Sequence, residues 1–301
     1  MRILVIGNDS RIGGRLTTAL LARGHNVIGT TRNVKNIKNP NEIFFDLASN
    51  DQPALPETEA AVVCAAMARF EECRNQPELA YRVNVEAPVA IANQLVPRGT
   101  HVLLLSTSAV FDCYEPLRKA ESVRAPRSVY GRLKTEAESR LLERGQRTAV
   151  LRLTKVLNPE GGILTKWIDD LAIGEEIKAF EDHRFCPVPL CAAVDAIAAI
   201  IGSGETGLFQ LSGANDISYL EAALHLASRL GRSPEKVIAV SAAANGVLMN
   251  EITPYTSLDT SRLSQMIGFV PPCAFDVIDT VYGPTLARAV HNNGRYKRKN
   301  D

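Results

Sequence analysis

The start of the chain constrains the fold most, because an apolar run leads directly into a glycine-rich turn. The run Ile3–Ile6 has the composition of a buried strand, the turn reads Gly7-Asn-Asp-Ser-Arg-Ile-Gly13-Gly14, and a helical pattern covers Arg11–Arg23. A strand, such a turn and a helix in this order place a dinucleotide pyrophosphate on the helix N-terminus. Ser10 replaces the usual middle glycine, so it either crowds the backbone approach or adds a hydroxyl donor for phosphate. An ordinary tight turn is the alternative interpretation.

Short strand-like runs alternate with helical segments along the first half of the chain. This alternation predicts βαβ units and a parallel sheet. The runs Val102–Leu105 and Ala149–Leu153 are almost wholly apolar, as in strands covered on both faces. We therefore predict an α/β fold, a Rossmann-type doubly wound parallel sheet with a small C-terminal α/β substrate-binding region.

The expected boundaries follow the point where this pattern loosens. The Rossmann domain is expected over residues 1–153, with 190–211 returning to it, and the substrate-binding region over 154–189 and 212–301. Within that region Ser218-x-x-Glu221 predicts a capping box that opens a helix.

The second predicted strand carries information about the cofactor. It ends Gly29-Thr-Thr-Arg32, without the acidic residue that binds the ribose 2′-hydroxyl of NAD. Arg32 and Arg11 offer guanidinium groups that match a 2′-phosphate, so NADP is favoured and NAD is the alternative. Asp46 either accepts a hydrogen bond from the adenine amino group or caps its own loop.

A tyrosine and a lysine one helical turn apart form the candidate catalytic pair. Tyr130 and Lys134 share a face of a predicted helix, and Thr107 ends the central strand 23 residues earlier. A nearby ammonium favours the phenolate, so we expect Lys134 to lower the pKa of Tyr130. A surface Tyr-Lys pair is the alternative.

Composition excludes several classes of function. The 301 residues carry 34 basic and 33 acidic side chains, a net charge of +1, so no nucleic-acid or membrane partner is expected. The longest apolar stretch, Leu190–Ile201, is too short to cross a bilayer. The six cysteines form no C-x-x-C pair, so we expect no metal site and a reduced, cytoplasmic location without a signal peptide. The basic run Arg295–Lys299 is expected to be a solvated end.

Taken together, these segments resemble the extended short-chain dehydrogenase/reductase superfamily. The branch most similar is that of nucleotide-sugar reductases and epimerases, which includes the dTDP-4-dehydrorhamnose reductases. The resemblance covers essentially the whole chain and rests on the glycine-rich turn, Asp46-Leu47, Val63-Cys-Ala-Ala66, Val83-Asn84-Val85, Ser106-Thr-Ser-Ala-Val-Phe-Asp112, Tyr130-Gly-Arg-Leu-Lys134, Leu151-Arg152-Leu153, Arg184-Phe-Cys-Pro-Val188, Gly207-Leu-Phe-Gln-Leu211 and Leu258-Asp-Thr-Ser-Arg-Leu263.

The resemblance implies roles for individual residues. Tyr130 would be the acid/base, Lys134 its partner and a ligand of the nicotinamide ribose, and Thr107 a donor to the reacting carbonyl. Ser108 and Arg184 would contact the substrate, Arg184 at the nucleotide diphosphate, although a surface ion pair is the alternative for this arginine. The cofactor-binding residues would be Gly7, Ser10, Arg11, Ile12, Gly13, Arg32, Asp46, Leu47, Ala65 and Asn84.

Three departures from the family pattern bear on the reaction. Ser108-Ala109 stands where dehydratases carry an acidic pair, Lys155 stands where reductases carry a tryptophan, and Cys113 replaces a common glycine. The expected function is carbonyl reduction of a nucleotide-linked sugar. An epimerase and a non-catalytic, NADP-binding regulatory subunit are the alternatives, and a homodimer is compatible with all three.

Overall fold

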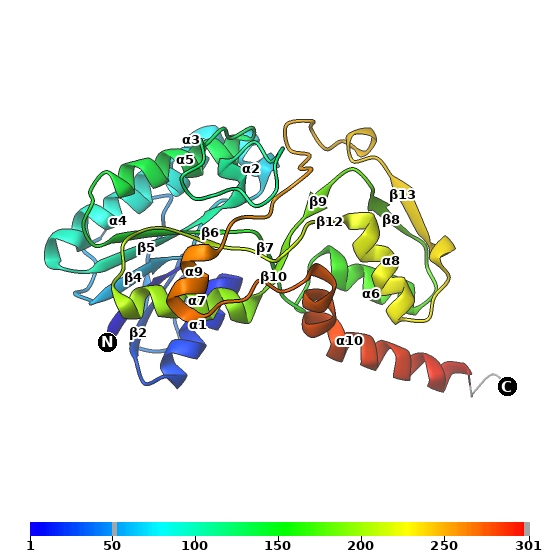
Figure 1. Cartoon of the computed structure of the whole chain (residues 1–301). Helices are drawn as coiled ribbons and strands as arrows, with labels where there is room; N and C mark the ends of the chain where they lie inside the picture. Colours follow the sequence, from blue (N-terminus) through cyan, green and yellow to red (C-terminus); the bar gives the residue numbers. More distant parts are fainter. Residues whose placement is uncertain (50–52, 298–301) are drawn as a thin grey trace.

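The computed structural model describes residues 1–49 and 53–297, apart from the side chains of 292–297. The basic run Arg295–Lys299 therefore lies outside the described side chains. Figure 1 shows two lobes side by side. In the described part of the chain, no helix is both long enough and apolar enough to cross a membrane.

The larger lobe is built on one parallel sheet with the strand order β11-β6-β5-β4-β1-β2-β3. The sequence prediction of an α/β doubly wound sheet is confirmed, and β11 pairs with β6 at the edge of this sheet. The strands are β1 (Arg2–Ile6), β2 (Asn26–Thr31), β3 (Glu42–Phe44), β4 (Ala60–Val63), β5 (His101–Thr107), β6 (Thr148–Leu153) and β11 (Gly207–Leu211).

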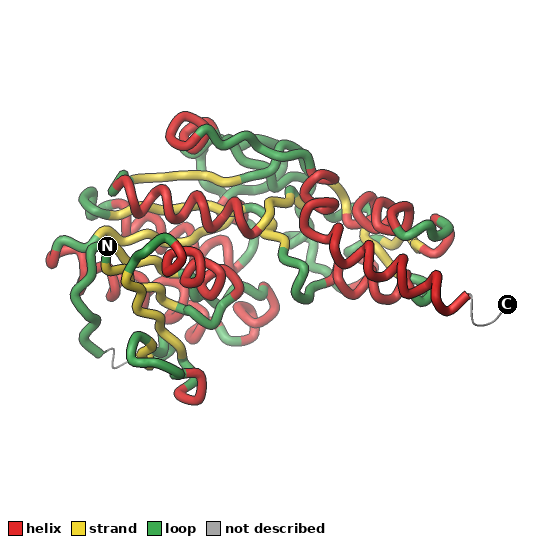
Figure 2. The backbone as a smooth tube through the Cα atoms, turned by 90° about the horizontal axis from the view of Figure 1, so that it is seen from below, coloured by secondary structure: helices red, strands yellow, loops and turns green. Residues whose placement is uncertain are grey.

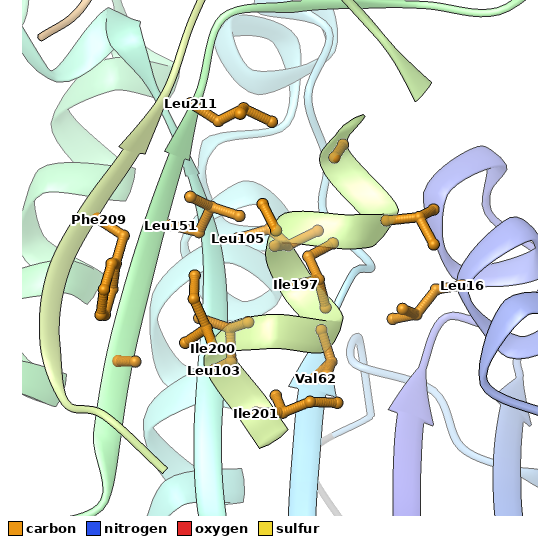
Figure 3. Packing of buried hydrophobic residues seen from close by; sticks show 14 of the residues in the cluster. Leu16, Val62, Leu103, Leu105, Leu151, Ile197, Ile200, Ile201, Phe209 and Leu211 are labelled. Atoms are coloured by element: carbon orange, nitrogen blue, oxygen red, sulfur yellow. The ribbon is translucent and has the colours of Figure 1, made fainter. Parts of the chain in front are cut away.

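Helices cover both faces of this sheet because its strands are apolar on both sides. In β1, Ile3 and Val5 face one cluster of buried side chains and Leu4 and Ile6 face another. Figure 3 shows part of the first cluster, in which helix side chains such as Leu16 and Ile197 pack against side chains of β4, β5, β6 and β11. The helices of the first face are α1 (Arg11–Ala22), α7 (Leu190–Ser203) and α9 (Ser261–Ile267); α4 (Ala87–Leu95) and α5 (Val129–Leu142) cover the second.

The chain reverses its direction of winding between β1 and β4. It lays down β1, β2 and β3 toward one edge and then returns to place β4 on the other side of β1. At such a reversal the connections leave toward opposite faces, and a crevice opens at the carboxyl ends of the strands. Two short helices, α2 (Phe70–Asn75) and α3 (Pro77–Tyr81), follow β4 at this edge. A π-helical turn, Arg82–Glu86, joins α3 to α4.

The smaller lobe has its own core of buried side chains. Three helices, α6 (Ile163–Ala172), α8 (Tyr219–Arg229) and α10 (Ala274–Lys297), pack around Trp167, Leu226 and Ile278. The predicted capping box at the start of α8 is confirmed, because Ser218 and Glu221 exchange hydrogen bonds. Figure 2 shows α10 running outward along this lobe. The short strands pair as β7 (Lys155–Leu157) with β10 (Pro187–Pro189), β9 (Arg184–Phe185) with β12 (Ile217–Ser218), and β8 (Ile177–Phe180) with β13 (Val237–Val240).

Candidate active site

A cavity of about 850 Å³ lies at the carboxyl ends of the central strands and is lined by both lobes. It brings together most residues that the sequence singled out. Those that line it are Gly7, Ser10, Arg11, Ile12, Arg32, Asp46, Leu47, Ala65, Thr107, Ser108, Tyr130 and Arg184. Gly13, Asn84 and Lys134 do not line it and lie behind its wall.

The glycine-rich turn forms one end of this cavity. Gly7 has a φ of +84°, and a Cβ built there would stand 2.6 Å from the Cβ of Ala65. A Cβ on Gly13 would stand 2.1 Å from the carbonyl oxygen of Gly7. The Ser10 hydroxyl accepts a hydrogen bond from the amide of Gly13 at 3.0 Å, so it caps α1. The first turn of α1 has no acidic residue, and its N-terminus presents positive potential to the cavity.

The two arginines that the sequence assigned to a 2′-phosphate, Arg32 and Arg11, extend in different directions. Arg32 is exposed at the strand end, whereas the Arg11 guanidinium reaches the smaller lobe, 3.7 Å from a Cβ built on Gly161. Asp46 accepts a hydrogen bond from the amide of Ala48 at 2.9 Å, the loop cap that was its alternative interpretation. Its second carboxylate oxygen has no partner among the described residues.

Close packing of α5 on the end of β5 brings Tyr130 to the cavity that Thr107 lines. A Cβ on Gly131 would stand 2.1 Å from the carbonyl oxygen of Ala109, so only glycine permits this approach. Ser128 caps α5 by accepting from the amide of Gly131 at 3.0 Å. The Thr107 hydroxyl accepts from the amide of Ala109 at 3.2 Å, which leaves its own proton for another acceptor.

The titration of Tyr130 differs from the sequence expectation. Burial is the main cause of a pKa above the usual range of tyrosine, and the nearby Cys73 adds to it. Lys134 lies 1% exposed, and burial lowers its pKa to about 8, although the charge of Glu138 opposes that shift. The expected lowering of the Tyr130 pKa by Lys134 is therefore wrong for the protein alone, because desolvation and Cys73 set the direction of the shift.

Asn84 lies behind the wall of the cavity and bonds to a loop that forms part of that wall. Its carboxamide accepts from the Met67 amide at 3.1 Å and donates to the Met67 carbonyl at 2.9 Å. Both of its polar ends thus hold the loop after β4, which lines the cavity. The π-helical turn that carries Asn84 turns this carboxamide toward the loop.

An ion pair with no exposed surface supports the end of β5. Glu138 accepts from Ser106 Oγ at 2.5 Å and from Arg152 Nη2 at 2.7 Å, and both members of the pair are 0% exposed. Arg152 also donates to the carbonyl of Ala120 and to Gln210. The network joins β5, α5, β6 and β11 next to Thr107, which follows Ser106 in β5.

Apart from Arg184, the residues that the smaller lobe and its loop contribute were not identified from the sequence. A bridging loop, residues 241–260, crosses to the larger lobe (Figure 1). Its Glu251 is buried in an ion pair with Arg74 of α2, and Arg127 donates to the carbonyl of Ile252 at 3.0 Å. Glu251 lines the cavity, as does Asp9, which accepts from the Thr31 hydroxyl at 2.8 Å. A solitary acid in a coil segment gives no periodic signal that would have revealed Glu251.

Arg184 lines the cavity with its charge already paired. Its Nη2 donates to the carbonyl of Asp216 at 3.0 Å and lies 3.3 Å from the carboxylate of Glu221. Across the described residues, no cluster of three or more potential metal ligands occurs. The site thus offers a dinucleotide cradle, a tyrosine and a threonine in one cavity.

Comparison with known proteins agrees with this geometry. The family model described as RmlD substrate binding domain matches residues 1–278. A dTDP-4-dehydrorhamnose reductase of Sinorhizobium fredii is 29% identical over 232 residues, 73% of this chain and 75% of that protein. The beta subunit of methionine adenosyltransferase 2 from Pongo abelii is 35% identical over 92 residues, 31% of this chain and 28% of that protein.

A solved structure supports the fold. The dTDP-4-dehydrorhamnose reductase of Bacillus anthracis in complex with NADP superposes with a TM-score of 0.79 at 18% identity, covering 93% of this chain and 98% of that one. At this identity the likeness shows the Rossmann-type fold.

Proposed function

We propose that this chain, which belongs to the RmlD substrate binding domain family, is an NADP-dependent oxidoreductase that reduces a carbonyl of a nucleotide-linked sugar. The observation that carries the proposal is that Tyr130 and Thr107 face the same cavity as the glycine-rich turn. The similarity to proteins named dTDP-4-dehydrorhamnose reductase over about three quarters of both chains supports the substrate class.

The residues at the turn fit a dinucleotide phosphate. The positive φ of Gly7 and the N-terminus of α1, whose first turn carries no acidic residue, suit the pyrophosphate, and Arg32 suits the 2′-phosphate of NADP. Arg32 has no ion-pair partner among the described residues. When bound, the cofactor supplies a hydride to the carbonyl carbon.

The chain's own groups handle the carbonyl oxygen. The free proton of the Thr107 hydroxyl makes a hydrogen bond to this oxygen, which polarises the carbonyl. The Tyr130 hydroxyl, which is protonated at neutral pH and whose pKa burial raises further, delivers a proton to the oxygen as negative charge develops on it. Lys134, one helical turn away, then stabilises the phenolate that remains.

Replacing Tyr130 by Phe tests the acid. Turnover should fall by roughly 10² to 10⁴ while NADPH affinity stays nearly unchanged, since the hydroxyl acts on the substrate. Tyr114→Phe is the matched control, because Tyr114 is exposed and lies outside the cavity. Full turnover in Tyr130→Phe would refute the assignment.

The net reaction is read from the absorbance of NADPH on mixing with nucleotide-linked 4-keto sugars. Stoichiometric loss supports reduction. A new sugar isomer without loss would support the epimerase alternative, whose fold is represented by UDP-glucose 4-epimerase of Thermotoga maritima at a TM-score of 0.76. If NADPH is not lost and no new isomer forms, the result supports a regulatory role. The similarity to the beta subunit of methionine adenosyltransferase 2 favours this alternative.

A further inference from the structure

The acidic groups of the cavity wall are already engaged within the protein. Four carboxylates line the cavity, and each accepts a hydrogen bond from a donor in the chain. The pairs are Asp9 with the Thr31 hydroxyl, Asp46 with the Ala48 amide, Glu72 with Arg69, and Glu251 with Arg74. Glu72 and Glu251 are thus paired with arginines, whereas Asp9, in the glycine-rich turn, and Asp46, after β3, accept only from neutral donors.

The cations are engaged unequally. Arg184 is paired with Glu221, Arg32 is exposed at the end of β2, and the guanidinium of Arg11 extends from the glycine-rich turn to the neighbourhood of Gly161. Lys155, at the substrate end, has no carboxylate partner among the described residues, and its ammonium stands 5.9 Å from the ring centre of Tyr219. The smaller lobe therefore presents one uncompensated positive charge to the cavity.

Lys155 follows closely in the sequence after Leu153, the residue that pairs with Thr107. Thr107 of β5 pairs with Leu153 at the end of β6, and Lys155 begins β7 two residues later. Its side chain is exposed to the cavity. A group bound by Lys155 would thus belong to the part of the substrate that carries the carbonyl.

His183 lies beside Lys155 and supplies a second donor. Its ring stacks on Tyr219, with 5.3 Å between centroids. Its Nδ1 accepts from the backbone amide of Thr253 at 3.1 Å, so in the neutral ring the proton is on Nε2. Burial and the charge of Lys155 lower the pKa of His183, which keeps it neutral near pH 7. No described residue bonds Nε2.

We propose that Lys155 and the Nε2–H of His183 form a subsite for a carboxylate on the sugar, so that the substrate is a nucleotide-linked uronic acid. One charged and one neutral donor match a monoanion, whereas the diphosphate of the substrate carries more charge than this pair compensates. The proposal rests on the proposed function for the orientation of the sugar, with its reacting carbon near Thr107.

Binding of two probes that differ only at the carboxylate tests the subsite. Calorimetry on the full chain with NADP⁺ should show UDP-glucuronic acid binding about 10- to 100-fold more tightly than UDP-glucose, the range for a hydrogen bond to a charged group. Lys155→Met should abolish this preference and Lys155→Arg should retain most of it. Lys178→Met, an exposed lysine of the same lobe that lies outside the cavity, should leave the preference unchanged.

Each other result has a defined meaning. If Lys155→Met weakens both sugars equally, Lys155 binds the diphosphate and the carboxylate subsite is refuted. Equal or undetectable binding of the two sugars to the unmodified chain also overturns it. Because the assay needs no turnover, a clear preference without NADPH oxidation by any keto sugar would refute the proposed function and leave the subsite standing.

Discussion

Replacing Glu138 by Gln should destabilise the protein more than any exposed charge change. The substitution keeps the side-chain volume but removes the negative charge that faces Arg152, and both side chains are 0% exposed. The amide of Gln would also present a donor to Ser106 and Arg152, which already donate to this position. Arg152 would then be a buried guanidinium without a counter-ion.

The magnitude follows from this burial. Removing one partner of a buried ion pair costs about 3–5 kcal/mol, because the remaining charge keeps its desolvation penalty. An unfolding entropy of about 2.1 cal/mol/K per residue gives roughly 0.6 kcal/mol/K for 301 residues. The melting temperature should therefore fall by about 5–8 °C.

Differential scanning calorimetry with a control on the same helix measures this effect. Glu136 pairs with Arg140, both about two-fifths exposed, so Glu136→Gln should cost no more than about 0.5 kcal/mol. Replacing Glu138 and Arg152 together by Leu and Met should recover part of the loss, since the guanidinium of Arg152 is then no longer buried without a counter-ion. Equal melting temperatures for Glu138→Gln and Glu136→Gln would refute the reasoning.

Three other charged positions around the cavity give measurable expectations. Arg32→Ala should reduce the preference for NADPH over NADH by about 1–3 kcal/mol, measured by calorimetry with both nucleotides; an unchanged preference would contradict the role of Arg32. Relative to Lys134→Met, the unmodified protein should gain free energy of unfolding as pH rises from 8 to about 10.4, by at most about 3 kcal/mol. The reason is that over this range the unfolded chain binds one more proton than the folded chain. Urea titrations at several pH values check this, and equal pH dependences of the two proteins would count against it. Glu251→Gln should raise the KM for the sugar roughly 5- to 30-fold with a smaller change in kcat, because the pairing with Arg74 that holds the bridging loop is weakened. Steady-state kinetics that show an unchanged KM would exclude this role of Glu251.

The sequence predicted the larger lobe well because its signals are local. Continuous apolar runs mark strands covered on both faces, and the capping box at Ser218 marks the start of α8. The segment around Asn84 is one whose local structure short-range patterns do not predict. The chain is helical from Pro77, and Asn84 lies in a π-helical turn where its side chain bonds to the backbone of Met67, a contact between positions 17 residues apart.

The site was predictable only where a motif spans few residues. The turn at Gly7 and the spacing of Tyr130 and Lys134 are short-range patterns, and the cavity wall includes Gly7 and Tyr130. Contacts such as Glu251 with Arg74 join positions 177 residues apart, and no local pattern reports them. The raised pKa of Tyr130 likewise depends on burial, which spacing alone does not reveal.

The order in which the strands and helices occur has a consequence for synthesis on the ribosome. All seven strands of the large sheet are complete once β11 ends at Leu211. The core of the smaller lobe joins Leu157 and Trp167 to Ile278 and Leu286 of α10, so its last pieces emerge much later. Because domains form from the N-terminus as the chain grows, the sheet can assemble while α6 still exposes its apolar face, and a chaperone acting during translation would meet that face first.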